Sequence, residues 1–275
     1  MKPFLTLVRK NLHDARWSLF LSATLLGFLG WLLVYVASRQ ETRIRQALTS
    51  GEGFNWVRRM GLDADPPSIE IMMAFWNHPF IILLVAMFAL GRGANAVGAE
   101  IERGTLDMVM SRPVSRSAYL GAQVLASSLG ILLIAAALAV GAYAATYYNV
   151  LKSPPSFRVL MEPALNLAAL AFPMYGYTLW FSSMDIVRWR ALTAGSALTL
   201  AGFIARVIAL IPVFEESWWR PWAEHASLFS LYNPVDAVSG RGHVGQDVAI
   251  LLGLGAGFIA LAFLSFAYRD LPANA

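Results

Sequence analysis

The sequence predicts an all-α membrane protein with six transmembrane helices, an N-terminal interfacial helix and a charged insert between the second and third spans. Three observations predict this class. First, 57% of the 275 residues are hydrophobic and only 14% are charged, which is unusual for a soluble chain of this length. Second, the apolar residues form runs long enough to cross a bilayer. Third, the basic residues are dispersed at the ends of these runs, which is typical of membrane anchoring and not of a nucleic-acid-binding stripe.

The N-terminal segment, residues 1–16, is amphipathic. Its apolar residues fall on one helical face and its basic residues fall mostly elsewhere, as in a helix that lies flat at a membrane interface. A frayed basic terminus is the alternative. The apolar run over residues 17–37 follows, and we expect it to be a retained span because a signal-peptide core has only about 7 to 15 residues.

Five further spans follow. The second begins near Ile69 or Met73, is kinked at Pro79 and ends at about Gly98. The others are expected at residues 118–147, 164–183, 191–212 and 248–268. Six spans place both termini on one side, and the basic residues packed closest to helix ends lie on that side, which predicts cytoplasmic termini. The whole chain, residues 1–275, is then one membrane domain.

Several kinds of chemistry are not expected. The chain has no cysteine, which excludes disulfides and thiolate sites. The four histidines lie far apart in the sequence, and we expect no metal site: His13, His78, His225 and His243. The glycines of the GxGxxG pattern at 240–245 follow no predicted strand, and no GxxxxGK[ST] motif occurs. We expect no catalytic residue and no cofactor on this chain, because no span pairs a serine with a histidine or one aspartate with another.

The side opposite the termini carries a candidate pathway or gate. Arg206 is the basic residue expected well inside a span, where a charge lines a cavity, pairs or snorkels to the surface. In the segment 213–246, the stretch WWRPWAEHASLF and the apolar residues that follow it are too short to span, and we expect the segment to be re-entrant or interfacial. We assign the pathway or outer gate to four residues: Arg206, Glu215, Trp218 and Trp219. Simple aromatic anchoring at the interface is the alternative.

Small residues recur every fourth position in the last two spans. They are Gly253 and Gly257 in the last span and Ala197, Ala201 and Ala205 in the fifth. Small residues allow the backbones of membrane helices to approach closely. This spacing predicts helix contacts either within the chain or with another subunit.

The charged insert, residues 99–117, is sharply punctuated. Glu100 and Glu102 precede a break at Gly104, and we expect Thr105 to cap a short helix with Asp107 in its first turn. Pro113 stops this helix and Ser115 caps the next one. The basic residues Arg103, Arg112 and Arg116 should keep the insert at the membrane surface. The apolar residues of the short helix are expected to form an exposed patch that docks on a partner: Leu106, Met108, Val109 and Met110. A well-capped connector is the alternative.

The stretch GTLDMVMSRPVSRSAYLGAQ, residues 104–123, closely resembles the loop between the second and third spans of ABC-2 type permeases, the membrane subunits of ATP-binding-cassette exporters. YNPVD before the last span and the closing FAYRDL agree with this family. The resemblance implies that the insert is a cytoplasmic coupling helix seated in a cleft of a separate ATPase, that two permeases pair, and that helices one, two and five border the route. It assigns ATPase coupling to residues between Glu100 and Pro113: Glu100, Glu102, Arg103, Gly104, Thr105, Leu106, Asp107, Met108, Arg112 and Pro113.

The expected function is that of a non-catalytic permease subunit in a bacterial cytoplasmic membrane. It would move a substrate outward by means of two ATPase subunits that bind ATP and Mg, and it would pair with a second copy of itself. Membrane lipids are expected contacts and nucleic acid is not. The first alternative is a mechanical transducer that acts on an extracytoplasmic partner, as in metalloenzyme maturation, without solute transport. The second is a secondary transporter or channel.

Overall fold

The computed structural model describes residues 2–50, 62, 66–111, 113–148, 155–214 and 217–269, and within these residues it contains helices and turns but no strand. The long helices are α1 (Lys2–Ser50), α4 (Pro79–Asn95), α7 (Arg116–Tyr148), α8 (Phe157–Met184), α9 (Arg188–Ala209) and α12 (Val244–Tyr268). The short ones are α3 (Ser68–Ala74), η1 (Phe75–Asn77), α5 (Gly98–Glu102), α6 (Thr105–Met110), η2 (Pro212–Phe214), α10 (Arg220–Ala226), η3 (Leu228–Leu231) and α11 (Pro234–Ser239).

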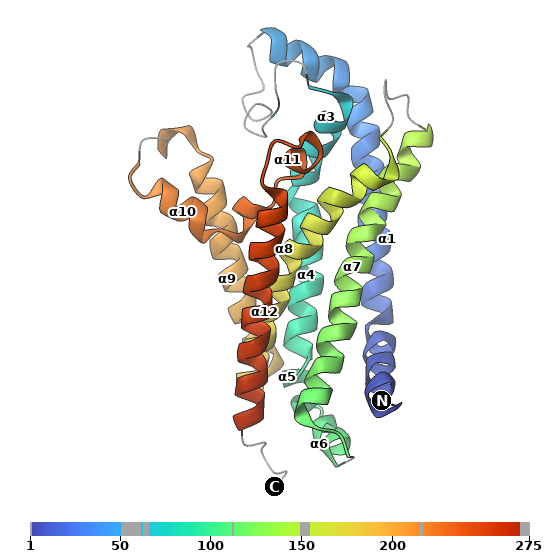
Figure 1. Ribbon diagram of the computed structural model, residues 1–275, viewed down its shortest axis with the longest axis vertical. Coiled ribbons are helices and arrows are strands. Elements are labelled where there is room, and N and C mark those ends of the chain that lie inside the picture. The colour runs from blue at the N-terminus through green and yellow to red at the C-terminus, as the bar shows by residue number, and fades with distance from the viewer. Residues whose placement is uncertain are drawn as a thin grey trace.

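The long helices lie roughly along one axis, alternate in direction and form an elongated bundle (Figure 1). Both termini lie at one end of the bundle, together with α5 and α6, and we call this the terminal end. The helices α3, α10 and α11 lie at the opposite end. The charged insert is therefore on the same side of the bundle as the two termini, as the alternation of predicted spans requires.

Four of the described helices are long and apolar enough to cross a membrane: α1, α7, α9 and α12. The pair formed by residues 68–77 and α4 passes the same test together, with a bend of 52°, which raises the count to five. The predicted count of six is therefore not confirmed. The predicted fourth span, α8, is not among them; it carries two internal prolines and polar residues that include Asn166 and Thr178.

The bend before α4 lies at His78 and not inside a continuous helix. His78 has an extended backbone (φ −62°, ψ 130°) and Pro79 is the first residue of α4. A residue that precedes proline avoids the helical region, and proline lacks the N–H that a helix interior needs, but it fits the first turn. The second span therefore begins as a broken helix.

The predicted interfacial helix is not a separate element. Residues 2–16 continue into the first span, because α1 runs unbroken from Lys2 to Ser50 and no glycine or proline occurs between residues 4 and 26. The apolar face expected to rest on a membrane packs instead on α7, where Val8 contacts the buried Ala122 and Ala126. An amphipathic pattern shows that one face is covered, but it does not show what covers it.

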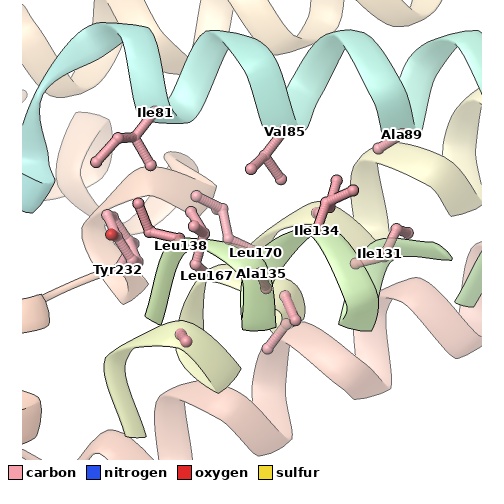
Figure 2. Packing of buried hydrophobic residues seen from close by; sticks show 14 of the residues in the cluster. Ile81, Val85, Ala89, Ile131, Ile134, Ala135, Leu138, Leu167, Leu170 and Tyr232 are labelled. Carbon is pink, nitrogen blue, oxygen red and sulfur yellow. The ribbon is translucent and has the colours of Figure 1, made fainter. Parts of the chain in front are cut away.

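The core forms where α4, α7 and α8 meet (Figure 2). Ile81, Val85 and Ala89 of α4 face the other two helices, and all three side chains are buried. Their partners are also buried: Ile131, Ile134, Leu138, Leu167 and Leu170. Because lipid is as apolar as these side chains, close packing more than exclusion of water favours this arrangement in a membrane.

Glycines set the closest helix crossings. Between α1 and α7, a Cβ on Gly141 would overlap the carbonyl oxygen of Gly27, and a Cβ on Gly30 would overlap that of Leu138. The small residues singled out in the sequence behave differently, since a Cβ on Gly253 or Gly257 would meet nothing within 4 Å. The spacing predicted contacts for these two glycines, and the chain itself does not supply them.

Candidate functional site

The insert is held to the bundle at the junction of α4 and α5. Ser182 on α8 accepts hydrogen bonds through Oγ from the N–H groups of Val97 (3.3 Å) and Gly98 (2.9 Å), and donates one to the carbonyl oxygen of Ala94 (3.0 Å). A Cβ on Gly98 would lie 3.2 Å from the backbone of Arg188. Glycine thus lets α5 start against the first residue of α9, and Ser182 joins α4, α5 and α8 at this point.

Glu100 links the insert to α1. Its side chain is buried, with 6% of the residue exposed. Oε1 accepts a hydrogen bond from Lys10 Nζ at 3.2 Å, and Oε2 accepts one from the Thr105 hydroxyl at 2.5 Å. A charge-assisted bond to a largely desolvated carboxylate is among the stronger polar contacts in a protein. A displacement of α5 is therefore opposed by both α1 and α6.

The structure overturns the expected role of Thr105. Gly104 occupies the N-cap position of α6 in the left-handed conformation (φ 66°), and Thr105 is the first helical residue. The Thr105 hydroxyl is bonded to the carboxylate and the carbonyl oxygen of Glu100, and it makes no cap. A positive φ favours glycine, which explains why the chain turns at Gly104. The predicted cap at Ser115 is confirmed, because its Oγ accepts from the N–H of Ala118 at 3.1 Å.

Glu102 links the insert to α9. Its Oε1 accepts the backbone N–H of Arg188, the first residue of α9, at 2.9 Å. A carboxylate at this position satisfies a free N–H at a helix N-terminus and interacts favourably with the helix dipole. The two glutamates of the insert therefore bind different helices, Glu100 to α1 and Glu102 to α9.

The exposed surface of α6 is smaller than the sequence predicts. Leu106, expected in the exposed patch, is buried (2% exposed) and packs into the core, whereas Met108 is 71% exposed. Two residues along a helix turn by about 200° at 3.6 residues per turn, and Leu106 and Met108 therefore face opposite sides. Other members of the predicted set are half-buried (Asp107, Val109, Met110) or exposed (Arg103, Pro113). Arg112 lies outside the described residues.

Two arginines close the terminal end of the bundle. Arg116 Nη1 donates to the carbonyl oxygens of Phe266, Ala267 and Arg269 at 2.6–3.1 Å. Arg269 Nη1 donates to the carbonyl oxygens of Ser183 and Asp185 at 2.9 and 3.0 Å. Basic side chains stabilise the free carbonyls at helix C-termini. The ends of α12 and α8 are therefore tied to the start of α7 beside the insert.

Arg92, on α4, is a charged residue that the sequence analysis missed, and Arg206 is therefore not the only basic residue inside a predicted span. It is 9% exposed. Its Nε donates to Ser127 Oγ at 3.2 Å and its Nη2 donates to Gln123 Oε1 at 3.3 Å, both on α7. An ionisable residue inside a membrane protein is costly and marks a functional candidate. The signal was present in the sequence as the polar interruption GRGAN in an apolar run.

The carbonyl oxygen of Ala96, one residue beyond α4, continues this network. It accepts hydrogen bonds from the hydroxyl of Tyr119 at 2.6 Å and from Nε2 of Gln123 at 3.4 Å. Two side chains of α7 thus bind the backbone just before α5, and one of them also binds Arg92. The insert is connected through this network to the middle of the bundle.

At the opposite end, a cavity of about 400 Å³ contains Arg206 from the last turn of α9. Asn77, Tyr232 and Asp236 line the same cavity. Two of the predicted companions of Arg206 do not line it: Trp218 is exposed, and Trp219 packs on Phe214 with ring centroids 5.2 Å apart. The third, Glu215, lies outside the described residues. In the described part of segment 213–246, the helices α10, η3 and α11 have seven, four and six residues, which is too short to span. Arg206 therefore belongs to a cavity with Asn77, Tyr232 and Asp236, and the tryptophans lie elsewhere.

Comparison with known proteins bears on the whole chain. No curated protein matches it. The family model described as ABC-2 family transporter protein matches residues 5–271, which includes the insert and every long helix described above. Residues 104–123 resemble the coupling loop of this same family. On this match over nearly its full length, the chain belongs to the ABC-2 family of transporter proteins.

Proposed function

We propose that the chain is the membrane-spanning permease subunit of an ATP-binding-cassette transporter, which moves a substrate outward with energy from ATP hydrolysed on a separate ATPase subunit. The observation that carries this proposal is the insert itself. It projects from the bundle at the terminal end (Figure 1), exposes Met108, and is bound through side chains to α1, α8 and α9. A surface element that is rigidly connected to several long helices can transmit a push from a docked partner.

In this proposal, the residues between Glu100 and Pro113 divide into two groups. Leu106, Glu100 and Glu102 hold the insert to the bundle through core packing, the bond to Lys10 and the bond to α9. Met108, the exposed residue of α6, faces outward and contacts the ATPase. Closure of two ATPases around ATP and Mg would displace α6 toward its counterpart in a second permease copy. The contacts of the two glutamates would then pull on α1 and α9.

The proposed topology has six crossings with both termini in the cytoplasm of a bacterium. The helix that makes the sixth crossing is α8, whose 28 residues extend about 42 Å at 1.5 Å per residue. This exceeds the roughly 30 Å hydrocarbon core. The polar residues of α8 are tolerated because they are buried between the other helices. Gly253 and Gly257 on α12 face away from the bundle and are available for the pairing of two copies.

Replacing Met108 by aspartate tests the docking role of α6. We expect the amount of ABC-type ATPase that co-purifies with the chain to fall at least tenfold, because a charge would be desolvated in an apolar cleft. The measurement is affinity purification of the full-length chain from membranes of cells that express the ATPase, with quantification of bound ATPase and of its ATP turnover. Met184→Asp is the matched control, since Met184 is 49% exposed at the same end of the molecule but lies on α8.

Retention of the ATPase by Met108→Asp at the level of the unchanged chain would refute docking through α6. An equal loss in both variants would show that any new charge at this end disturbs the complex. If no ABC-type ATPase accompanies the unchanged chain, the proposal of an ATPase-driven permease fails altogether.

A mechanical transducer is the second candidate, supported by the surface of α10. Trp222 on α10 and Trp218, two residues before this helix, are both strongly exposed. The helix α10 lies away from the insert, toward the opposite end of the bundle (Figure 1), and exposed tryptophans are frequent at binding surfaces. ATP-dependent uptake by inverted vesicles separates the two functions. Uptake of any candidate solute supports the permease, whereas ATP turnover that requires Trp218 and proceeds without uptake supports the transducer.

A further inference from the structure

A continuous groove runs between α4 and α9. Its inner part has a volume of about 440 Å³ and is lined almost entirely by apolar side chains, among them Phe80, Leu83, Met87, Leu200 and Phe203. Its outer part is the cavity of about 400 Å³ that contains Arg206. The two parts share the lining residues Pro79, Ile82, Phe203 and Phe229. They therefore adjoin, and we treat them together as one groove with an apolar half and a polar half.

The inner part opens toward the surrounding membrane. Phe80, Leu83 and Met87 on α4 and Leu200 on α9 are all exposed on the outside of the bundle. From Pro79 to Leu90, both of which line this part, α4 rises about 16 Å at 1.5 Å per residue. That is about half of a 30 Å hydrocarbon core. The apolar part therefore matches the depth of one lipid leaflet, on the side where Arg206 lies.

The outer part presents two side chains of opposite charge that are not bonded to each other. Within the described part of the chain, neither the Arg206 guanidinium nor the Asp236 carboxylate makes a hydrogen bond or an ion pair. Arg220 and Glu224, whose charges act on Arg206, form an ion pair with each other, with Nε and Oε1 3.3 Å apart. A guanidinium binds phosphate through several N–H donors, and a carboxylate binds an ammonium group. The cavity therefore offers complementary sites to both charges of a zwitterionic head group.

We propose that this groove binds a phospholipid-like amphiphile from the outer leaflet, with an acyl chain between α4 and α9, the phosphate at Arg206 and an amine toward Asp236. Three features of the groove support this proposal: its apolar and polar halves, its lateral opening, and the charges of Arg206 and Asp236, which have no partner among the described residues. If the chain is the permease proposed above, amphiphiles of this kind are its substrate class. The binding itself does not depend on coupling to an ATPase.

Lipid binding to the purified full-length chain tests the proposal. Native mass spectrometry in detergent would compare phosphatidylethanolamine, phosphatidylglycerol and diacylglycerol with identical acyl chains. We expect both phospholipids to bind at least tenfold more tightly than diacylglycerol. Arg206→Gln should remove this preference, and Asp236→Asn should weaken phosphatidylethanolamine only. Arg220→Gln is the matched control, since Arg220 lies at the same end but does not line the groove, and it should leave all three affinities unchanged.

A second variant separates the groove from the general lipid surface. Leu83→Trp would fill the inner part and should reduce the binding of all three lipids. Equal lipid affinities for the unchanged chain and Arg206→Gln would overturn the proposal. Full lipid binding by Leu83→Trp would also overturn the proposal, whatever the fraction of dimer. If this variant also had a lower fraction of dimer, the groove would be an interface between two copies of the chain. Met108→Asp should not change lipid binding, and failure of ATPase coupling would therefore leave this result intact.

Discussion

Gly141→Ala is expected to destabilise the protein by about 1–3 kcal/mol, the usual cost of overpacking. In an ordinary helix this change would stabilise by about 1 kcal/mol, because alanine is the better helix former. Here the new Cβ would overlap the carbonyl oxygen of Gly27 on α1. A backbone atom cannot rotate away as a side chain can, and α1 and α7 would have to separate. Thermal unfolding of the purified chain in detergent, followed by size-exclusion chromatography, measures the effect.

Gly253→Ala is the matched control for this prediction. Gly253 also lies inside a long helix, α12, but a Cβ there would meet nothing within 4 Å. Both variants receive the same gain in helix propensity, and the difference between them reports the crossing of α1 and α7. Gly253→Ala should be as stable as the unchanged chain or more stable. Equal stability of the two variants would show that α1 and α7 do not approach as closely as described.

Arg92→Lys is expected to destabilise the protein by about 1.5–3 kcal/mol, which is the typical value of a hydrogen bond to a charged group. The guanidinium donates to Ser127 from Nε and to Gln123 from Nη2. A lysine ammonium is a compact point charge, and it cannot reproduce this forked geometry. The variant would keep a buried charge and lose part of the polar environment that makes the charge tolerable. Denaturant or thermal unfolding in detergent gives the magnitude.

Arg92→Met provides the decisive comparison. Methionine matches the long side chain and removes the charge, and apolar replacement of buried charges is often neutral or stabilising. Gln123 retains its bond to the carbonyl oxygen of Ala96. We expect Arg92→Met to be at least as stable as the unchanged chain, and the unchanged chain to be more stable than Arg92→Lys. If Lys were as stable as Arg while Met was strongly destabilised, the charge itself, and not its geometry, would stabilise the bundle.

The sequence located the insert correctly but not the contacts of its residues. The break at Gly104 and the cap at Ser115 could be predicted because both are local features. A glycine turn depends on the backbone φ of one residue, and an N-cap depends on a hydroxyl that lies two to three residues before the N–H it binds. The exposed position expected for Leu106 was wrong, because this side chain packs into the core. The cap expected at Thr105 was also wrong, because its hydroxyl binds the carboxylate of Glu100. A pattern of apolar residues over six positions cannot show which side faces the bundle.

The charged residues inside the spans show the same division. Arg206 was singled out in the sequence, and it does line a cavity, but its companions Asn77, Tyr232 and Asp236 lie 129, 26 and 30 positions away in the chain. Arg92 was missed because a long apolar run masks a single charge. Its partners on α7 are 31 and 35 positions further along. Only the packing of α4 against α7 brings them together.

From the sequence alone, composition and apolar periodicity predict a helical membrane protein with a charged insert after its second apolar segment. The resemblance of residues 104–123 to a loop of the ABC-2 type permeases points to the family, because a local motif can be compared without knowledge of the fold. The tertiary structure alone decided that residues 2–16 pack on α7, that α8 lies buried among the other helices and that Met108 is the outward residue of α6. It also decided that an apolar groove ends at Arg206. The physical reason is that burial and pairing depend on which helices lie side by side, and the spacing of residues within one helix does not contain that information.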